Sequence, residues 1–204
     1  MKENRDVYLA CKSSTVLDEI ESESVNFVVT DPPFYDNVMY SELSDFFYAW
    51  IQNPLKDTGK FTNTRIDSSK EIIKNHVKDR NFYKESLKKV YSECNRVLRK
   101  DGLMTFTFHH SNPDAWKCIE EAILQSNFKV IDAIPVFSEM DTSTSILNKS
   151  AGVIDVILVC AKRESTYPSI SRDYSKIIKS FKQEFGLKET DINSIKISAN
   201  LVGV

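Results

Sequence analysis

The stretch Val25-Asn-Phe-Val-Val-Thr-Asp-Pro-Pro-Phe34 places an apolar run directly before an aspartate and two prolines. Its first six residues are largely β-branched and apolar, which is typical of a strand buried on both faces. The strand must end at Asp31, because neither Pro32 nor Pro33 can donate a hydrogen bond to a neighbouring strand. In open α/β sheets ligands bind beyond the carboxyl ends of strands, so Asp31 to Phe34 are predicted to stand at a binding edge.

The flanking sequence alternates between strand and helix patterns. From Tyr83 to Leu98 apolar residues recur at the helical period, and Gly102 is expected to stop this helix. Asn112-Pro113 is expected to open another helix, since proline is favoured at a first helical position. Further strands are expected over 7–11, 103–108, 130–136 and 153–160, helical turns over 14–20, and helices over 40–51 and 173–185. This order predicts an α/β sheet whose last connection is antiparallel.

Two segments are too polar for regular structure. Residues 53–79 are expected to form a long loop with some helix near 71–76, and residues 138–152 a loop rich in serine and threonine. Residues 53–100 hold 13 Lys/Arg and 6 Asp/Glu, a net charge of +7 in a chain whose overall charge is −2. Such a stretch either faces a polyanion or is a solvated helix face with a polar loop, and both interpretations stay open on charge alone.

Composition excludes several classes of protein. The 204 residues are 41% hydrophobic and 27% charged, which is ordinary for one globular domain and excludes a disordered or disulfide-scaffold chain. No apolar run approaches the ~18 residues of a membrane helix. The first residues lack the apolar core of a secretory signal, so we expect a cytoplasmic protein with no membrane partner.

The cysteines and histidines match no metal-binding pattern. The cysteines are scattered without a C-x-x-C pair, and the histidines complete no zinc spacing. We therefore expect reduced, mostly buried thiols and no metal. The residues concerned are Cys11, Cys94, Cys118, Cys160, His76, His109 and His110.

The tetrapeptide is suited to holding an amine. An exocyclic amine of a nucleobase is a poor nucleophile, because its lone pair is delocalised into the ring. If the Asp31 carboxylate and the Pro32 carbonyl accept both N–H bonds, the nitrogen becomes pyramidal and its lone pair can attack a sulfonium methyl group. Phe34 is expected to stack on the base. A purely structural turn after the strand is the alternative interpretation.

Three segments carry a family resemblance. Val28-Val-Thr-Asp-Pro-Pro-Phe34 resembles the catalytic motif of S-adenosylmethionine-dependent amino-methyltransferases, which methylate adenine N6 or cytosine N4. The runs 31–50, 103–116 and 136–140 resemble one subgroup, the large bacterial and archaeal adenine-specific DNA methylases with an N-terminal domain of unknown function. The resemblance extends over roughly residues 7–200 and so covers nearly the whole chain.

The resemblance implies roles for individual residues. Asp31 and Pro32 would hold the target amine, Pro33 would shape the turn, and Phe34, in place of the commoner tyrosine, would stack on a base flipped out of DNA. Ser13 and Asp31 are expected at the cofactor. Substrate-binding candidates are Tyr35, Asn37, His109 and His110, for which loop packing or a structural role is the alternative.

The cofactor-binding features of this class are missing from the sequence. Its members bind the methionyl part of the cofactor on a Gly-rich turn that allows close backbone approach, and hold the ribose with an acidic residue. None of the five glycines forms a G-x-G or follows a first strand, and Ser13 takes the place of an acid often found after the third strand. We therefore expect a partial Rossmann-like class I methyltransferase sheet with flanking helices, lacking its first two strands.

The expected domain organisation follows from the absence of the first two strands. We expect one incomplete catalytic domain over 1–204, with 53–80 as a polar insertion or recognition loop and 162–204 as a C-terminal helical extension. Without its neighbours the strand before Asp31 would expose an apolar edge, which invites pairing with another chain. This predicts a homodimer, association with a complementary N-terminal half, or a rearranged sheet.

The expected function is methylation of an amino group in DNA, with adenine N6 as the target and restriction–modification or phage defence as the setting. The isolated chain would be inactive if nothing else supplies the Gly-rich turn. One alternative is a non-catalytic or split-enzyme subunit that binds nucleic acid. A further alternative is a methyltransferase of RNA or of a protein amide, because similar tetrapeptides serve those substrates.

Overall fold

The computed structural model describes residues 7–59, 63, 65–138 and 153–204. The segment 139–152 and the end of the run 136–140 therefore lie outside the described residues. Strands are β1 (Val25–Thr30), β2 (Leu98–Phe108), β3 (Phe128–Phe137) and β4 (Ile154–Lys162). Helices are α1 (Tyr40–Leu55), α2 (Arg80–Val97), α3 (Pro113–Gln125), α4 (Tyr174–Phe185) and α5 (Glu189–Leu201), with 3-10 turns η1 (Lys56–Thr58) and η2 (Ser68–Lys70).

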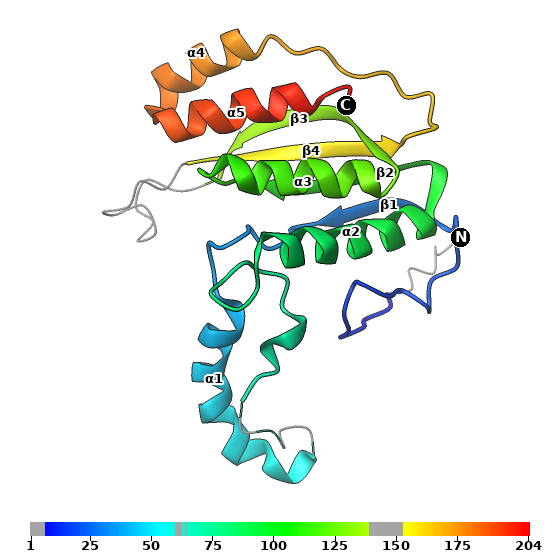
Figure 1. The fold of residues 1–204 in the computed structure, drawn as a ribbon, viewed down its shortest axis with the longest axis vertical. Coiled ribbons are helices and arrows are strands. Elements are labelled where there is room, and N and C mark those ends of the chain that lie inside the picture. Colours follow the sequence, from blue (N-terminus) through cyan, green and yellow to red (C-terminus); the bar gives the residue numbers. More distant parts are fainter. Residues whose placement is uncertain (1–6, 60–62, 64, 139–152) are drawn as a thin grey trace, which may run out of the picture.

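The strands form one sheet in the order β1-β2-β4-β3 (Figure 1). β1 runs parallel to β2, whereas β4 is antiparallel to both β2 and β3. The α/β class, the flanking helices and the antiparallel last connection are thus confirmed. In the described part of the chain none of these helices is long and apolar enough to cross a membrane.

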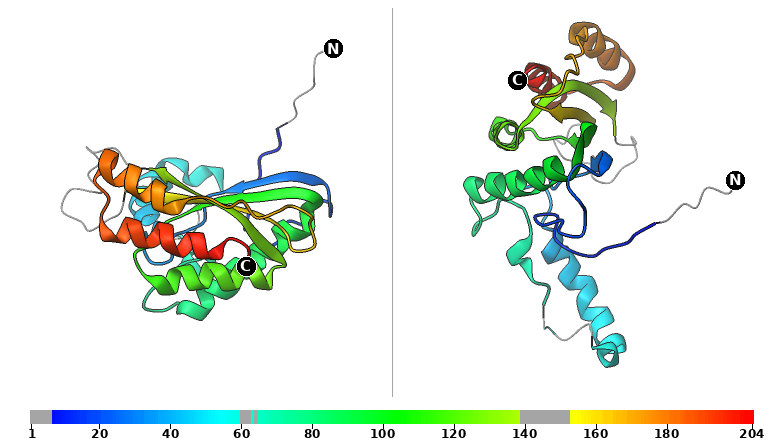
Figure 2. Two further views of the ribbon diagram at one scale, coloured as in Figure 1. Left: turned by 90° about the horizontal axis from the view of Figure 1, so that it is seen from above. Right: turned by 90° about the vertical axis from the view of Figure 1, so that its right-hand side faces the viewer.

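The core lies between the sheet and the helices α2 and α3, which pack side by side against it (Figures 1 and 2). Phe106 and Phe108 point inward from alternate positions of β2. Their rings lie 5.3 Å from that of Tyr91 and 4.9 Å from that of Trp116, respectively. Asn112 caps α3 by accepting from the Asp114 amide, as the Asn-Pro pair predicts.

β1 forms one edge of the sheet and differs from the sequence prediction in its burial. Its Val25 and Val28 pack against the core, but Phe27 and Val29 are 69% and 78% exposed. The prediction of a strand buried on both faces is therefore wrong. Among the described residues β1 pairs with β2 alone, so within this part of the chain its outer edge and its second face stay open. The exposed apolar edge expected from the sequence is present.

The boundary between α2 and β2 also differs from the prediction. The helix ends at Val97 rather than near Gly102, because Leu98 is already extended and starts a strand that continues through Gly102. The chain needs glycine there for a reason other than a helix stop. A Cβ atom at Gly102 would lie 2.8 Å from the Asn26 carbonyl oxygen, so glycine permits the close approach of β1 and β2.

Two predicted local elements near the amino terminus are absent. Residues 7–11 form no strand, since no described strand lies beside them. Residues 14–20 form turns instead of helix. The Arg96 guanidinium hydrogen-bonds the carbonyls of Leu17 and Ile20, at 2.8 and 3.0 Å, and so attaches these turns to α2.

The remaining differences concern helices. No helix forms over 71–76, because the Lys74 amide donates to the Tyr35 carbonyl at 2.9 Å and the Lys78 ammonium takes the Glu71 carbonyl at 2.6 Å. The expected helix over 40–51 extends to Leu55, and α4 ends at Gly186 as predicted.

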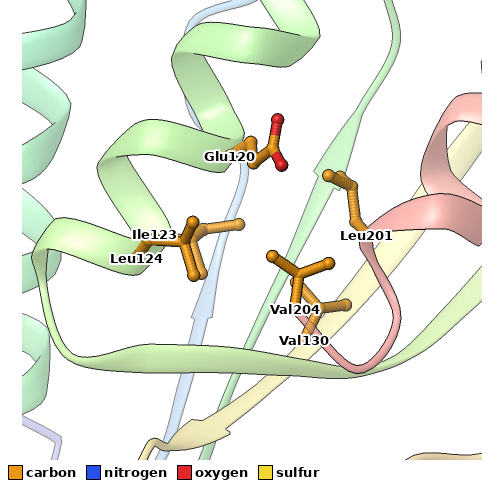
Figure 3. A pocket seen from close by; sticks show the side chains of 6 residues that line it. All are labelled: Glu120, Ile123, Leu124, Val130, Leu201 and Val204. Carbon is orange, nitrogen blue, oxygen red and sulfur yellow. The ribbon is translucent and has the colours of Figure 1, made fainter.

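α5 follows α4 within the segment 162–204, which was expected as a helical extension, but no second helix after residue 185 was expected. Its end is attached to the sheet, since the Gly203 amide donates to the Val130 carbonyl at 2.9 Å. Figure 3 shows Leu201 and Val204 next to Ile123 and Val130, around a small apolar depression. The helix is therefore held by contacts with β3 and β4 of the sheet and with the helices α3 and α4.

Candidate active site

The carboxyl ends of β1 and β2 bring the tetrapeptide and the two histidines to one edge. Thr30 pairs with Phe106, so Asp31 lies beside Thr107 on the neighbouring strand. The Thr107 hydroxyl donates to one oxygen of the exposed Asp31 carboxylate. The Phe34 ring packs edge-on against Phe108, with 5.4 Å between centroids, and is half-buried. The edge predicted from the sequence is thus assembled.

The two proline carbonyls differ in what they contact. The Pro33 carbonyl accepts from the Tyr83 hydroxyl at 2.6 Å and from the Tyr35 amide at 3.0 Å. Within the described residues the Pro32 carbonyl accepts no hydrogen bond. The acceptors left at this turn are therefore the Pro32 carbonyl and the second oxygen of Asp31.

Tyr35 supports the turn from beneath. It is buried, has a positive φ of 57°, and packs edge-on against the rings of Tyr83 and His110. Burial raises the pKa of the Tyr35 phenol to about 12, so it stays protonated at neutral pH. Asn37 is exposed, and its amide donates to the Phe34 carbonyl at 3.0 Å. A substrate role for either residue remains a prediction.

His110 ties the turn to α3. Its Nδ1 accepts from the Asn112 amide at 2.9 Å, which leaves the proton on Nε2, 3.0 Å from the Asp36 carboxylate. The Trp116 indole donates to the His110 carbonyl at 2.8 Å. Burial lowers the pKa of His110, and this outweighs the opposite effect of Asp36. The folded protein therefore holds His110 neutral.

The neutral His110 predicts a pH dependence of stability. Below its ordinary pKa of 6.5 the unfolded chain binds a proton at this residue that the folded chain does not. We expect the free energy of unfolding to fall as the pH drops below 6.5, and to level off below the folded-state pKa. Urea unfolding of the wild type and His110→Asn between neutral pH and about pH 5 measures this slope. The exposed His76→Asn serves as control, and an equal slope in His110→Asn would contradict the assignment.

His109 occupies the position before His110 and is half-buried on the other side of the strand end. Its Nδ1 is enclosed and has no hydrogen-bond partner among the described residues. An enclosed nitrogen without a partner is unusual in a folded protein. A substrate role for His109 stays a prediction.

A pocket of about 270 Å³ adjoins Asp31. It lies between the tetrapeptide, the segment with Ser13, and α2, and brings together the two predicted cofactor residues, Ser13 and Asp31. Tyr91 also lines it, and the buried Tyr91 hydroxyl has no partner in the described part of the chain. Burial holds the Tyr91 pKa well above its usual value, so the hydroxyl remains a donor. Sequence patterns assign Tyr91 only to the helix core and did not identify it as a pocket residue.

The basic stretch is largely paired within the protein. Arg80 bonds Glu121 at 3.0 Å, Lys74 lies 3.4 Å from Asp36, and Lys78 donates to backbone carbonyls. These cations are paired with groups of the same chain. For this part of 53–100 that favours a solvated helix face with a polar loop over a surface that faces a polyanion. Lys70 lines the pocket next to Asp31.

The thiols and the acidic groups offer no metal site. Cys94, Cys118 and Cys160 are buried free thiols, and Cys11 is exposed. Over the described ranges no group of three or more His, Cys, Asp or Glu side chains could hold a metal ion.

Comparison with known proteins assigns the family. A family model described as DNA methylase matches residues 25–199. Among solved structures the chain is similar to a candidate DNA modification methylase of Thermus thermophilus, TTHA0409, in its complex with S-adenosyl-L-methionine. That match has 16% identity, a TM-score of 0.43, and covers 79% of this chain and 55% of that chain. The selenomethionine form of the same protein matches with 15% identity and a TM-score of 0.40, over 81% and 55% of the two chains.

The chain thus spans about half the length of the solved proteins it matches. No curated protein is significantly similar to it. The family model, in contrast, extends from β1 to α5 and includes the tetrapeptide and both histidines. Because this model matches most of its length, the chain belongs to the DNA methylase family.

Proposed function

We propose that the chain carries the base-binding face of an S-adenosylmethionine-dependent amino-methyltransferase that acts on DNA, with adenine N6 as the target. One observation carries this proposal. The turn after β1 holds two acceptors, the Pro32 carbonyl and one Asp31 oxygen, while the neighbouring Pro33 carbonyl is already taken. Two adjacent acceptors match the two N–H bonds of one exocyclic amine.

In this proposal the protein prepares the amine for attack. Asp31 and Pro32 accept its two hydrogens and draw the nitrogen toward a pyramidal geometry, which frees its lone pair. Phe34, seated against Phe108, stacks on the flipped base. Asp31 can take the proton that leaves the amine after transfer, and His109, at the end of the neighbouring strand, would contact the base or its backbone. Tyr35, Asn37 and His110 keep the turn in place.

The pocket beside Asp31 fits part of the cofactor. Ser13 and Asp31 would hold it there, and S-adenosylmethionine would supply the methyl group. At about 270 Å³ the pocket is just below the range of ~300–1,000 Å³ that encloses small ligands. Of the residues that the structure describes, no glycine and no acidic residue besides Asp31 lines it, so a Gly-rich turn and a separate acid for the ribose are not found there. We infer that the rest of the cofactor site comes from other residues, with the open edge of β1 as the place where a complementary half adds its strands.

A second function is favoured by the same incomplete pocket. A non-catalytic or split-enzyme subunit would keep the base-binding turn and the 53–80 segment but would not bind the cofactor alone. Either protein would bind DNA and would suit a restriction–modification or phage-defence system.

Calorimetry with S-adenosylmethionine on the 204-residue chain, followed by transfer of labelled methyl groups to DNA, tests the proposal. Micromolar binding with transfer to adenine supports a complete enzyme, in this chain or its oligomer. No binding, together with retained DNA binding, supports the split-enzyme subunit. Transfer that is lost when unlabelled RNA, but not DNA, is added as a competitor would overturn DNA as the substrate.

Thr107 supplies a further test of the turn. Its hydroxyl is expected to hold the Asp31 carboxylate so that the other oxygen faces the amine. Thr107→Val keeps the shape of the side chain but removes this donor, so kcat should fall about ten- to a hundredfold with KM little changed. Thr107→Ser should retain most activity. Equal kcat values in the valine variant and the wild type would contradict this role.

A further inference from the structure

Helix α1 extends away from the body of the protein, together with the segment that returns along it (Figures 1 and 2). Its large apolar residues are more exposed than is usual in a folded domain, and the most exposed of those on α1, Trp50, is 70% exposed. The exposed set comprises Tyr40, Leu43, Phe46, Phe47, Trp50, Ile51 and Leu55, which we call the α1 face.

The orientation of α1 is determined by its opposite side. The Tyr48 hydroxyl and the Gln52 amide both donate to the Asn63 carbonyl, at 2.9 and 2.7 Å. The Ser41 hydroxyl donates to Glu71 at 2.6 Å, and Asp45 accepts from the Ile66 amide at 2.7 Å. These bonds attach the polar side of the helix to the returning segment. The α1 face is therefore held toward solvent.

The spacing along the α1 face is that of a helix-pairing seam. Tyr40, Leu43, Phe47 and Trp50 are separated by three, four and three residues, the alternation that keeps apolar side chains on the line where two helices meet. In an antiparallel pair of identical helices Tyr40 faces Trp50 of the second copy, and Leu43 faces Phe47. Each apolar residue of the seam then meets another, so the seam is self-complementary.

The size of the α1 face suits a stable dimer. Large aromatic side chains bury roughly 150–250 Å² each when covered. Seven large residues that are about half exposed therefore offer on the order of 800 Å² per copy, which is one side of a standard protein–protein interface. Phe27 and Val29, the two exposed apolar residues of β1, offer much less apolar area.

The charge of α1 favours a second copy of the chain over DNA as the partner of the α1 face. α1 contains Glu42 and Asp45 but no Lys or Arg, so a polyanion such as DNA would be repelled. Ser44 and Asn53, which flank the seam, are uncharged and create no repulsion between identical helices. We propose that the α1 face is the interface of a homodimer built on antiparallel α1 helices. This proposal does not depend on methyl transfer.

Light scattering after gel filtration of the full chain tests the interface. The wild type should have the mass of two chains, and Phe47→Glu and Trp50→Glu should each weaken the dimer about thirtyfold or more, as hot-spot residues do. Phe27→Glu introduces the same charge at the exposed face of β1 and should leave the dimer intact. A monomeric wild type at about 100 µM, or a dimer dissociated by Phe27→Glu and not by Phe47→Glu, would overturn the proposal.

Tryptophan emission gives a second measurement that needs no variant. Trp116 is buried in the core, so the exposed Trp50 reports on the α1 face. Dilution of the wild type should shift the emission to the red as Trp50 becomes solvated, with a midpoint at the dimer dissociation constant. Emission that stays constant while the mass halves would place the interface elsewhere and overturn the proposal.

Discussion

Replacing Asp31 with alanine is expected to abolish methyl transfer and to leave folding and DNA binding unchanged. The variant removes one of the two acceptors for the amine and the group that can take its proton, which together are worth about 10²–10⁴-fold or more in rate. Asp31 is exposed, and among the described residues its side chain hydrogen-bonds only Thr107, so its removal should leave the core undisturbed. Transfer of labelled methyl groups measures the activity, and fluorescence anisotropy measures DNA binding.

The control for Asp31 is Asp57→Ala, which removes an exposed carboxylate from η1 at the far end of α1. Its methyl transfer should equal that of the wild type. If Asp31→Ala retained wild-type kcat, the proposed role of the tetrapeptide would be wrong. If it lost DNA binding and activity together, Asp31 would be a binding residue and not part of the chemistry.

The largest effect on stability is expected for Trp116→Ala. Trp116 is buried under the turn, stacks edge-on against Phe108, and donates to the His110 carbonyl at 2.8 Å. Removing it leaves a cavity and takes away the shorter of the two hydrogen bonds at the His110 carbonyl, which keeps only the bond from the Ser194 hydroxyl at 3.3 Å. The free energy of unfolding should therefore fall by about 3–5 kcal/mol. Urea unfolding followed by circular dichroism measures the change.

Two further variants make the Trp116 result specific. Trp116→Phe keeps most of the packing and loses only the hydrogen bond, so a loss of about 1 kcal/mol is expected. Val77→Ala, at an exposed position, should change stability by less than about 0.5 kcal/mol. A small effect of Trp116→Ala would show that α3 is not anchored to the sheet through this residue.

A large part of the fold could be predicted from the sequence, because local chemistry determines where several elements begin and end. Two prolines end β1, Asn112-Pro113 opens α3, and Gly186 closes α4 in a left-handed conformation. The candidate edge was also predictable, since the residues at the carboxyl ends of two parallel strands must meet. The elements that were predicted wrongly, such as the strand expected over 7–11 and the helix expected over 71–76, are ones whose state depends on contacts with distant residues.

The sequence by itself determined the acceptor turn, because Asp31, Pro32 and Pro33 are stiff and short of donors whatever surrounds them. Only the tertiary structure decided which acceptors remain available. Tyr83 comes from α2 and donates to the Pro33 carbonyl, and Thr107 comes from β2 and donates to one Asp31 oxygen. These contacts join residues far apart in the chain, so their geometry depends on how the strands and helices pack and cannot be deduced from local pattern.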